Sequence, residues 1–151
     1  MSEKDLRTEL ETLSLKIRIS VLWLFSVVIM TLHFAVSIFE PNVVNLIISG
    51  KMQIGEEIFL LSALLAIVSL TMAFLSVTLK DSTNRWANII VGVVITVFYI
   101  LHLTIEQITA PSIHMAQPSI HQLLMNLSTV VVTAMIVWYA WKWPKGTRLL
   151  P

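Results

Sequence analysis

Long apolar runs separated by short polar segments dominate the chain. Four of them cover approximately 19–39, 58–79, 86–105 and 123–141, and each has between 19 and 22 residues. An α-helix of that length rises about 30 Å, which is the thickness of the hydrocarbon core of a bilayer. The runs lack the strict alternation of a membrane β-strand, and only helices or closed barrels satisfy their backbone groups in lipid. The pattern predicts an all-α fold, a four-helix transmembrane bundle forming a single domain over 1–151.

Composition supports the same class. The chain is 56% hydrophobic and 13% charged, whereas an ordinary soluble domain is about 45–50% apolar and about 25% charged. These proportions argue against a soluble enzyme, a nucleic-acid-binding module or a disordered tail, and a net charge of +1 indicates no nucleic-acid partner. Cysteine is absent, which excludes disulfides, thiolate metal sites and cysteine nucleophiles. The predicted solvent is the lipid bilayer.

The basic residues predict the orientation. With four spans, the N-terminal segment, the second loop and the C-terminal tail share one side, and this side holds nine of the ten basic residues. The positive-inside rule makes it cytoplasmic, so we expect a multi-pass protein of the cell (plasma) membrane with both termini inside. The first run is longer than the core of a cleaved signal peptide and follows a charged segment, so we expect it to be retained as a span.

Two shorter segments accompany the spans. Leu6, Leu10, Leu13 and Ile17 form one apolar stripe, which predicts an N-terminal amphipathic helical extension of the first span at the interface. A helix that docks a partner is the alternative. The segment 42–52 is apolar but too short to cross, so we expect it to lie in the interface or fold back over the mouth of the bundle.

Small residues recur along the second run at spacings of four and three: Ser62, Ala66, Ser69, Ala73 and Ser76. Because transmembrane helices associate by close packing, this seam predicts a contact face. The second span is therefore expected to be the central packing helix of a left-handed bundle.

Polar stripes on the other three runs predict a site. We expect them to turn inward, because polar side chains inside a membrane avoid lipid. Their depths match in the outer half of the bundle, where Glu40, Glu56 and Glu57 are candidates for a rim. The predicted polar pocket is lined by His33, Ser37, Tyr99, His102, Glu106 and Asn126.

Several kinds of chemistry suit such a pocket. Two histidines and carboxylates are possible ligands of a divalent cation, although their spacing matches no known signature. His33 and His102 at similar depth suit a b-type haem. Tyr99 and His102 would suit a quinone in an apolar slot. The structural alternative carries the most weight, because polar side chains also join transmembrane helices by hydrogen bonds alone.

Arg85 and Asn88 stand at the inner end of the third run. They suit anchoring and capping of that helix, or contact with an anionic lipid head group or a partner at the cytoplasmic face.

The chain resembles an uncharacterised family of small bacterial and archaeal four-helix membrane proteins, a domain of unknown function. The features that carry the resemblance are Gly50-Lys51-Met52, Leu75-Ser76, Asn84-Arg85-Trp86-Ala87-Asn88 and Trp138-Tyr139-Ala140-Trp141. The relatives tend to have a tyrosine and an aspartate in the first span, where this chain has Thr31-Leu32-His33-Phe34. The resemblance implies no activity. More loosely, the chain is similar to DoxX-like proteins, some of which are subunits of quinone-linked oxidoreductases.

These observations favour a non-enzymatic accessory or small-molecule-binding membrane protein that forms a homo-oligomer or joins another membrane subunit. Two alternatives stay open. One is a DoxX-like subunit linked to quinone or haem redox chemistry. The other is a component of an oligomeric transporter or channel, with His33, His102 and Glu106 as an ion or proton relay.

Overall fold

A computed structural model describes residues 3–50, 56–109 and 120–143, and these residues form five helices. The long helices are α1 (Glu3–Ile38), α3 (Glu56–Thr78), α4 (Asp81–Thr109) and α5 (Ile120–Trp141), with a short α2 (Pro41–Ile48) after α1. The four long helices are each long and apolar enough to cross a membrane. The predicted all-α four-helix bundle is confirmed.

Local chemistry sets the ends of several helices. Pro41 begins α2 at a position where the missing backbone N–H costs nothing, and Gly50 closes the following turn with a φ of 67°. Between α3 and α4 the turn is short. Lys16 of α1 holds it, since its ammonium donates to the Leu79 carbonyl at 3.1 Å and pairs with Asp81 at 2.8 Å. A lysine beside the end of a helix satisfies carbonyls that the helix itself leaves free.

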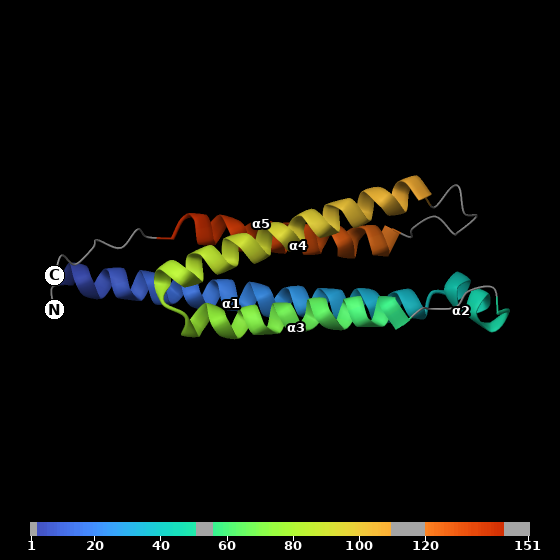
Figure 1. The fold of residues 1–151 in the computed structure, drawn as a ribbon, viewed down its shortest axis with the longest axis horizontal. Coiled ribbons are helices and arrows are strands. Elements are labelled where there is room, and N and C mark those ends of the chain that lie inside the picture. The colour runs from blue at the N-terminus through green and yellow to red at the C-terminus, as the bar shows by residue number, and fades with distance from the viewer. Residues whose placement is uncertain (1–2, 51–55, 110–119, 144–151) are drawn as a thin grey trace.

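The bundle is open on one side. The helix α1 packs along both α3 and α5, and α4 packs along α5, whereas α3 and α4 have few contacts with each other. In Figure 1 these two helices meet at their turn and diverge toward the α2 end. Three helix pairs therefore form extended interfaces, and the fourth side of the bundle is a seam that widens with distance from the turn.

The central packing helix is α1, which corrects the expectation for the second span. Ser69, Ala73 and Ser76 on the small-residue seam of α3 are buried as predicted, but α3 packs mainly along one neighbour, α1. The reason is that small residues permit close approach to a helix without determining how many helices approach.

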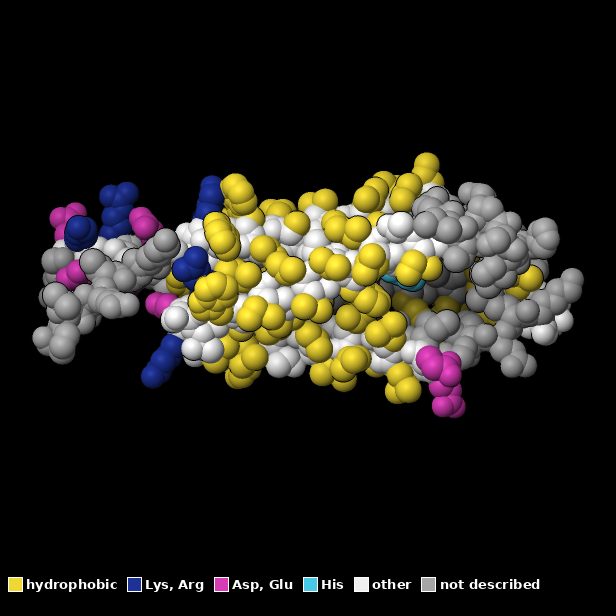
Figure 2. All heavy atoms as spheres, turned by 45° about the horizontal axis from the view of Figure 1, so that its top comes forward, with side chains coloured by type: hydrophobic (Ala, Val, Ile, Leu, Met, Phe, Trp, Pro, Cys, Tyr) yellow, Lys and Arg dark blue, Asp and Glu magenta, His cyan; other side chains and the backbone are white. Residues whose placement is uncertain are grey.

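The outer surface of the bundle is apolar. Leu, Ile, Val and Phe side chains are exposed along all four long helices. Figure 2 shows them as a broad belt, with charged side chains gathered toward the two ends. Exposed apolar surface of this extent is solvated by lipid rather than by water. The protein is a multi-pass membrane protein.

The predicted N-terminal extension is a continuous part of α1. In Figure 1 it projects past the other helices. Its apolar stripe is exposed, with 45% of the Leu6 surface and 58% of the Leu10 surface accessible. No helix break separates the extension from the span, so it continues along the axis of α1.

Buried polar side chains hold the turn end of the bundle together. The Trp23 indole of α1 donates to the Asn88 side-chain oxygen at 2.6 Å, and the Ser76 hydroxyl of α3 donates to the same oxygen at 3.1 Å. The Asn88 amide nitrogen in turn donates to the Asn84 side chain at 2.6 Å. All four residues are fully buried. This network joins α1, α3 and α4, and it lies at the end opposite α2.

Candidate ligand-binding cavity

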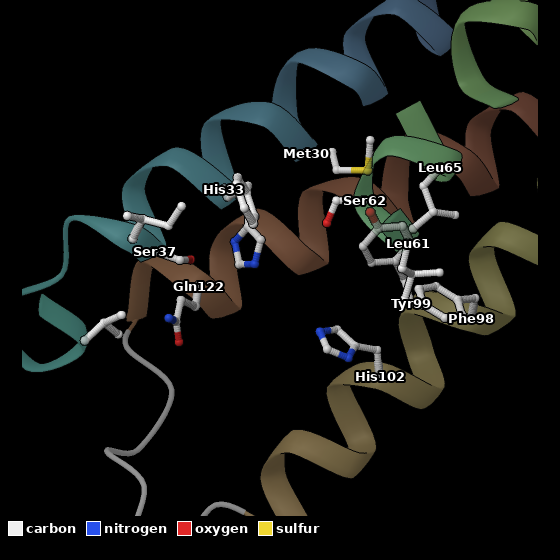
Figure 3. A pocket seen from close by; sticks show the side chains of 13 residues that line it. Met30, His33, Ser37, Leu61, Ser62, Leu65, Phe98, Tyr99, His102 and Gln122 are labelled. Carbon is white, nitrogen blue, oxygen red and sulfur yellow. The ribbon is translucent and has the colours of Figure 1, made fainter. Parts of the chain in front are cut away.

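A cavity of about 370 Å³ lies between the helices toward the α2 end. Helix α1 contributes the largest share of its wall, facing residues of α3 and α4, while Val43 of α2 and Gln122 of α5 complete it. Figure 3 shows the side chains that surround the space. The lining consists of Met30, His33, Phe34, Ser37, Ile38, Val43, Leu61, Ser62, Leu65, Phe98, Tyr99, His102 and Gln122.

Two polar groups of α1 in this wall have no hydrogen-bond partner among the described residues. The Nδ1 atom of His33 and the hydroxyl oxygen of Ser37 are both buried, and neither is bonded. The two residues are four positions apart, so they share one face of the helix. A buried polar group without a partner costs about 1–3 kcal/mol. A ligand that supplies a complementary group would recover that cost.

The opposite wall is aromatic. The Phe98 ring stacks on the His102 imidazole with centroids 6.2 Å apart and an interplanar angle of 5°. Tyr99 meets Phe98 edge-on at 5.7 Å and is 7% exposed. These contacts fix the rings on one side of α4. In Figure 3 the imidazoles of His33 and His102 point toward one another across the space between α1 and α4.

A polar contact lies beside the cavity at the α2 end. The Gln122 side chain donates from Nε2 to the Glu40 carboxylate at 3.1 Å. Glu40 occupies the position before the first turn of α2, and Gln122 lies in the first turn of α5. This bond connects α5 to the junction between α1 and α2.

The structure brings together four of the six predicted pocket residues, since His33, Ser37, Tyr99 and His102 all line the cavity. Asn126 does not line it, although it is buried on α5 with 1% of its surface exposed. The sixth residue is Glu106, whose side chain lies outside the described part of the chain.

Other lining residues were not predicted as part of the site. Ser62 belongs to the small-residue seam of α3, and Gln122 belongs to a polar stripe on α5. Phe98 and Leu61 are apolar, so the spacing of polar residues does not mark them. Such spacing identifies the polar residues that line a cavity, whereas the apolar lining residues can be identified only once it is known which helices pack together.

The possibility of a metal site finds no support among the described side chains. No group of three or more His, Cys, Asp or Glu residues lies close enough together there to hold an ion. His33 and His102 line the cavity without a described carboxylate among the other lining residues.

The two inner-face candidates occupy different environments. Asn88 is fully buried, and its four hydrogen bonds all lie inside the bundle, so it joins helices instead of facing lipid or a partner. Arg85 is partly exposed, and its guanidinium carbon lies 5.8 Å from the centre of the Trp86 ring. The Nε atom of Arg85 is buried without a partner. Of the two, Arg85 has the environment suited to lipid contact.

No protein-family model, no curated protein and no solved structure matches this chain. The family resemblance stays a prediction, and the cavity is interpreted from its own chemistry.

Proposed function

We propose that the protein is a non-enzymatic membrane protein that binds a small lipophilic molecule in the cavity between α1, α3 and α4. One observation carries this proposal. Within a mostly apolar wall, His33 and Ser37 line the cavity, and the buried Nδ1 and Oγ atoms of these two residues have no hydrogen-bond partner among the described residues. Ligand sites in proteins commonly combine apolar walls with a few such polar groups, which fix the orientation of the ligand.

The chemistry of the wall defines the class of ligand. A serine hydroxyl donates and accepts, and a neutral imidazole nitrogen does one or the other according to its tautomer. Among the described residues no Lys, Arg, Asp or Glu lines the cavity, so this part of the wall favours an uncharged or weakly acidic group over a strong ion. The aromatic and aliphatic walls suit an apolar body attached to that group.

The charge distribution supports placing this cavity in the outer half of the membrane. The opposite end carries Lys16, Lys80, Arg85 and Lys142, and the positive-inside rule assigns such an end to the cytoplasm. Both termini are then cytoplasmic, and the cell membrane is the proposed location.

The proposal is tested by extracting the purified protein with organic solvent and identifying co-purified molecules by mass spectrometry. The variants Ser37→Ala and His33→Leu remove the two unpartnered groups without a large increase in side-chain volume. Thr104→Val is the matched control, because Thr104 is exposed and its hydroxyl donates only to the Ile100 carbonyl of its own helix.

We expect an enriched species in the wild type and the control, and its loss from both cavity variants. Identical extracts from all four proteins, or extracts containing only bulk lipid, would contradict the proposal.

A redox cofactor is the second candidate, supported by the two imidazoles that face each other from α1 and α4 in Figure 3. His33 and His102 would hold a b-type haem from facing helices, and a quinone would accept hydrogen bonds from the same groups. An absorption spectrum of the purified protein distinguishes bound haem from bound quinone or another lipophilic ligand. A Soret band lost in both His33→Leu and His102→Leu would favour haem, and a flat baseline would eliminate it.

A further inference from the structure

We propose that the ligand reaches the cavity sideways from the bilayer, through the seam between α3 and α4. This inference rests on the proposed function, since it assigns an entry route and a ligand class to the same cavity. The first observation is the arrangement of the helices. Of the four sides of the bundle, only the α3–α4 side lacks an extended interface.

The cavity lies in the open part of this seam. Leu61, Ser62 and Leu65 border it from α3, and Phe98, Tyr99 and His102 border it from α4. Counted from the turn, Leu61 and Phe98 stand at nearly equal distances along the two antiparallel helices. Figure 2 shows that the surface is hollowed toward the α2 end of the apolar belt, with a histidine side chain visible inside.

The two edges of the seam are mostly apolar, with Ser62 and His102 as polar members. Neither 59–78 of α3 nor 86–105 of α4 contains a Lys, Arg, Asp or Glu. Leu61 and Leu101 beside the cavity are 44% and 56% exposed. An opening with such edges faces hydrocarbon, because an aqueous entrance inside a membrane is lined by polar or charged side chains.

The described residues offer no comparable opening elsewhere around the cavity. The interfaces of α1 with α3 and α5, and of α4 with α5, are extended. Toward the end of the bundle, Val43 of α2 covers part of the cavity, and the bond between Gln122 and Glu40 ties α5 to the α1–α2 junction. The seam is therefore the direct route for a molecule dissolved in the membrane.

The depth of the polar groups then defines the ligand further. His33 and Ser37 belong to α1, on the far side of the cavity from the seam, and most side chains at the edges of the seam are aliphatic or aromatic. A ligand that satisfies both regions is an amphiphile with a small hydrogen-bonding head and an apolar tail. Its head lies against α1, and its tail passes between α3 and α4 into the acyl chains.

The test uses a fatty acid with a diazirine in its tail, incorporated into phosphatidylcholine vesicles that contain the protein. After illumination, the labelled peptides are identified by mass spectrometry. Because the chain has no native cysteine, the seam is closed by a cleavable bifunctional thiosulfonate between Leu61→Cys and Phe98→Cys. As a control, the same double cysteine variant is treated with a monofunctional thiosulfonate, which modifies both cysteines without joining them. This control shows whether the added groups act by filling the cavity instead of by closing the seam.

We expect the label on the cavity-facing segments of α3 and α4, above the level on the lipid-exposed face of α5. Closing the seam should abolish this excess, and cleaving the tether should restore it. Ser62→Trp should also abolish the excess by filling the cavity from α3, whereas Ser128→Trp on the exposed face of α5 should not change it. Ser62→Trp keeps the proposal testable if the double cysteine variant does not fold.

Labelling that persists with the seam closed, while Ser62→Trp removes it, would overturn the entry route and leave ligand binding intact. Absence of any excess label, together with an extract that contains only bulk lipid, would overturn both proposals. A disulfide-linked dimer formed by Leu61→Cys alone would show that a second copy covers the seam, and it would also overturn the entry route.

Discussion

The Trp23 indole on α1 donates a hydrogen bond to the Asn88 side-chain oxygen on α4 across 2.6 Å, and both residues are fully buried. These two helices share no extended interface. The bond therefore spans the bundle, with Ser76 of α3 as a third participant. It holds together the end of the bundle at which α3 and α4 meet, opposite the end at which these two helices diverge.

We predict that Asn88→Leu lowers the thermal unfolding temperature by several degrees in detergent. The substitution leaves the Trp23 indole without an acceptor, and such a loss costs about 1–3 kcal/mol for one buried group, although interhelical bonds in membranes average about 0.6 kcal/mol. Ser128→Ala is the matched control, because that exposed hydroxyl donates only to the Leu124 carbonyl of its own helix. Equal unfolding temperatures for Asn88→Leu and the wild type would show that the network contributes no net stability.

Gly92 lies on the face of α4 that packs against α5. A Cβ atom at this position would lie 2.8 Å from a Val137 methyl carbon. Gly92→Ala is expected to destabilise the protein by about 1–3 kcal/mol, the usual cost of overpacking. Val137→Ala removes the methyl group in the way, so the double variant should recover most of the loss in a thermal unfolding assay. A double variant as unstable as the sum of the two single variants would contradict this packing.

The orientation is tested with single cysteines, since the chain has none of its own. Ser49 follows α2, and Ser82 begins α4 at the opposite end; both are exposed. In intact cells, a membrane-impermeant maleimide should label Ser49→Cys, and Ser82→Cys should react only after permeabilisation. The reverse pattern would place the cavity in the cytoplasmic half of the membrane.

Arg85 is expected to bind an anionic lipid phosphate, because its side chain is partly exposed at the basic end of the bundle. An arginine fork matches the oxygens of a phosphate. We predict that Arg85→Gln reduces the phosphatidylglycerol retained in native mass spectrometry. Lys80→Gln at the same end is the control, because the exposed Lys80 lacks this arrangement. If the two variants retain equal amounts of phosphatidylglycerol, Arg85 contributes only its positive charge.

Much of the fold was predictable because the bilayer imposes it. A run long enough to cross must form a helix, so the spans at 58–79 and 123–141 lie close to the observed α3 and α5. The inward stripe of α1 was also predictable, and His33 and Ser37 lie on it. The stripe is formed by Ser26, Met30, His33 and Ser37, and Trp23 stands three positions before Ser26 on the same face of the helix. Because Trp23 is aromatic, the pattern of polar residues did not predict that its indole donates a hydrogen bond.

It was harder to infer from the sequence which helices pack against one another. Small residues on α3 indicated a contact face without indicating which helix would occupy it, and nothing in the sequence predicted that α4 would diverge from α3. Asn126 shows the consequence for the site. Its place on an inward stripe predicted its burial correctly, but it does not line the cavity.

The most direct test of the central claim is an experimental structure of the protein prepared from native membranes and kept in lipid. We expect ordered density in the cavity, with a polar group within hydrogen-bonding distance of His33 Nδ1 and Ser37 Oγ. We also expect α3 and α4 to stay apart beside that density. A structure in which α3 and α4 pack along their whole length, with His33 and Ser37 bonded to protein groups and no space between the two helices, would contradict the proposed binding of a ligand.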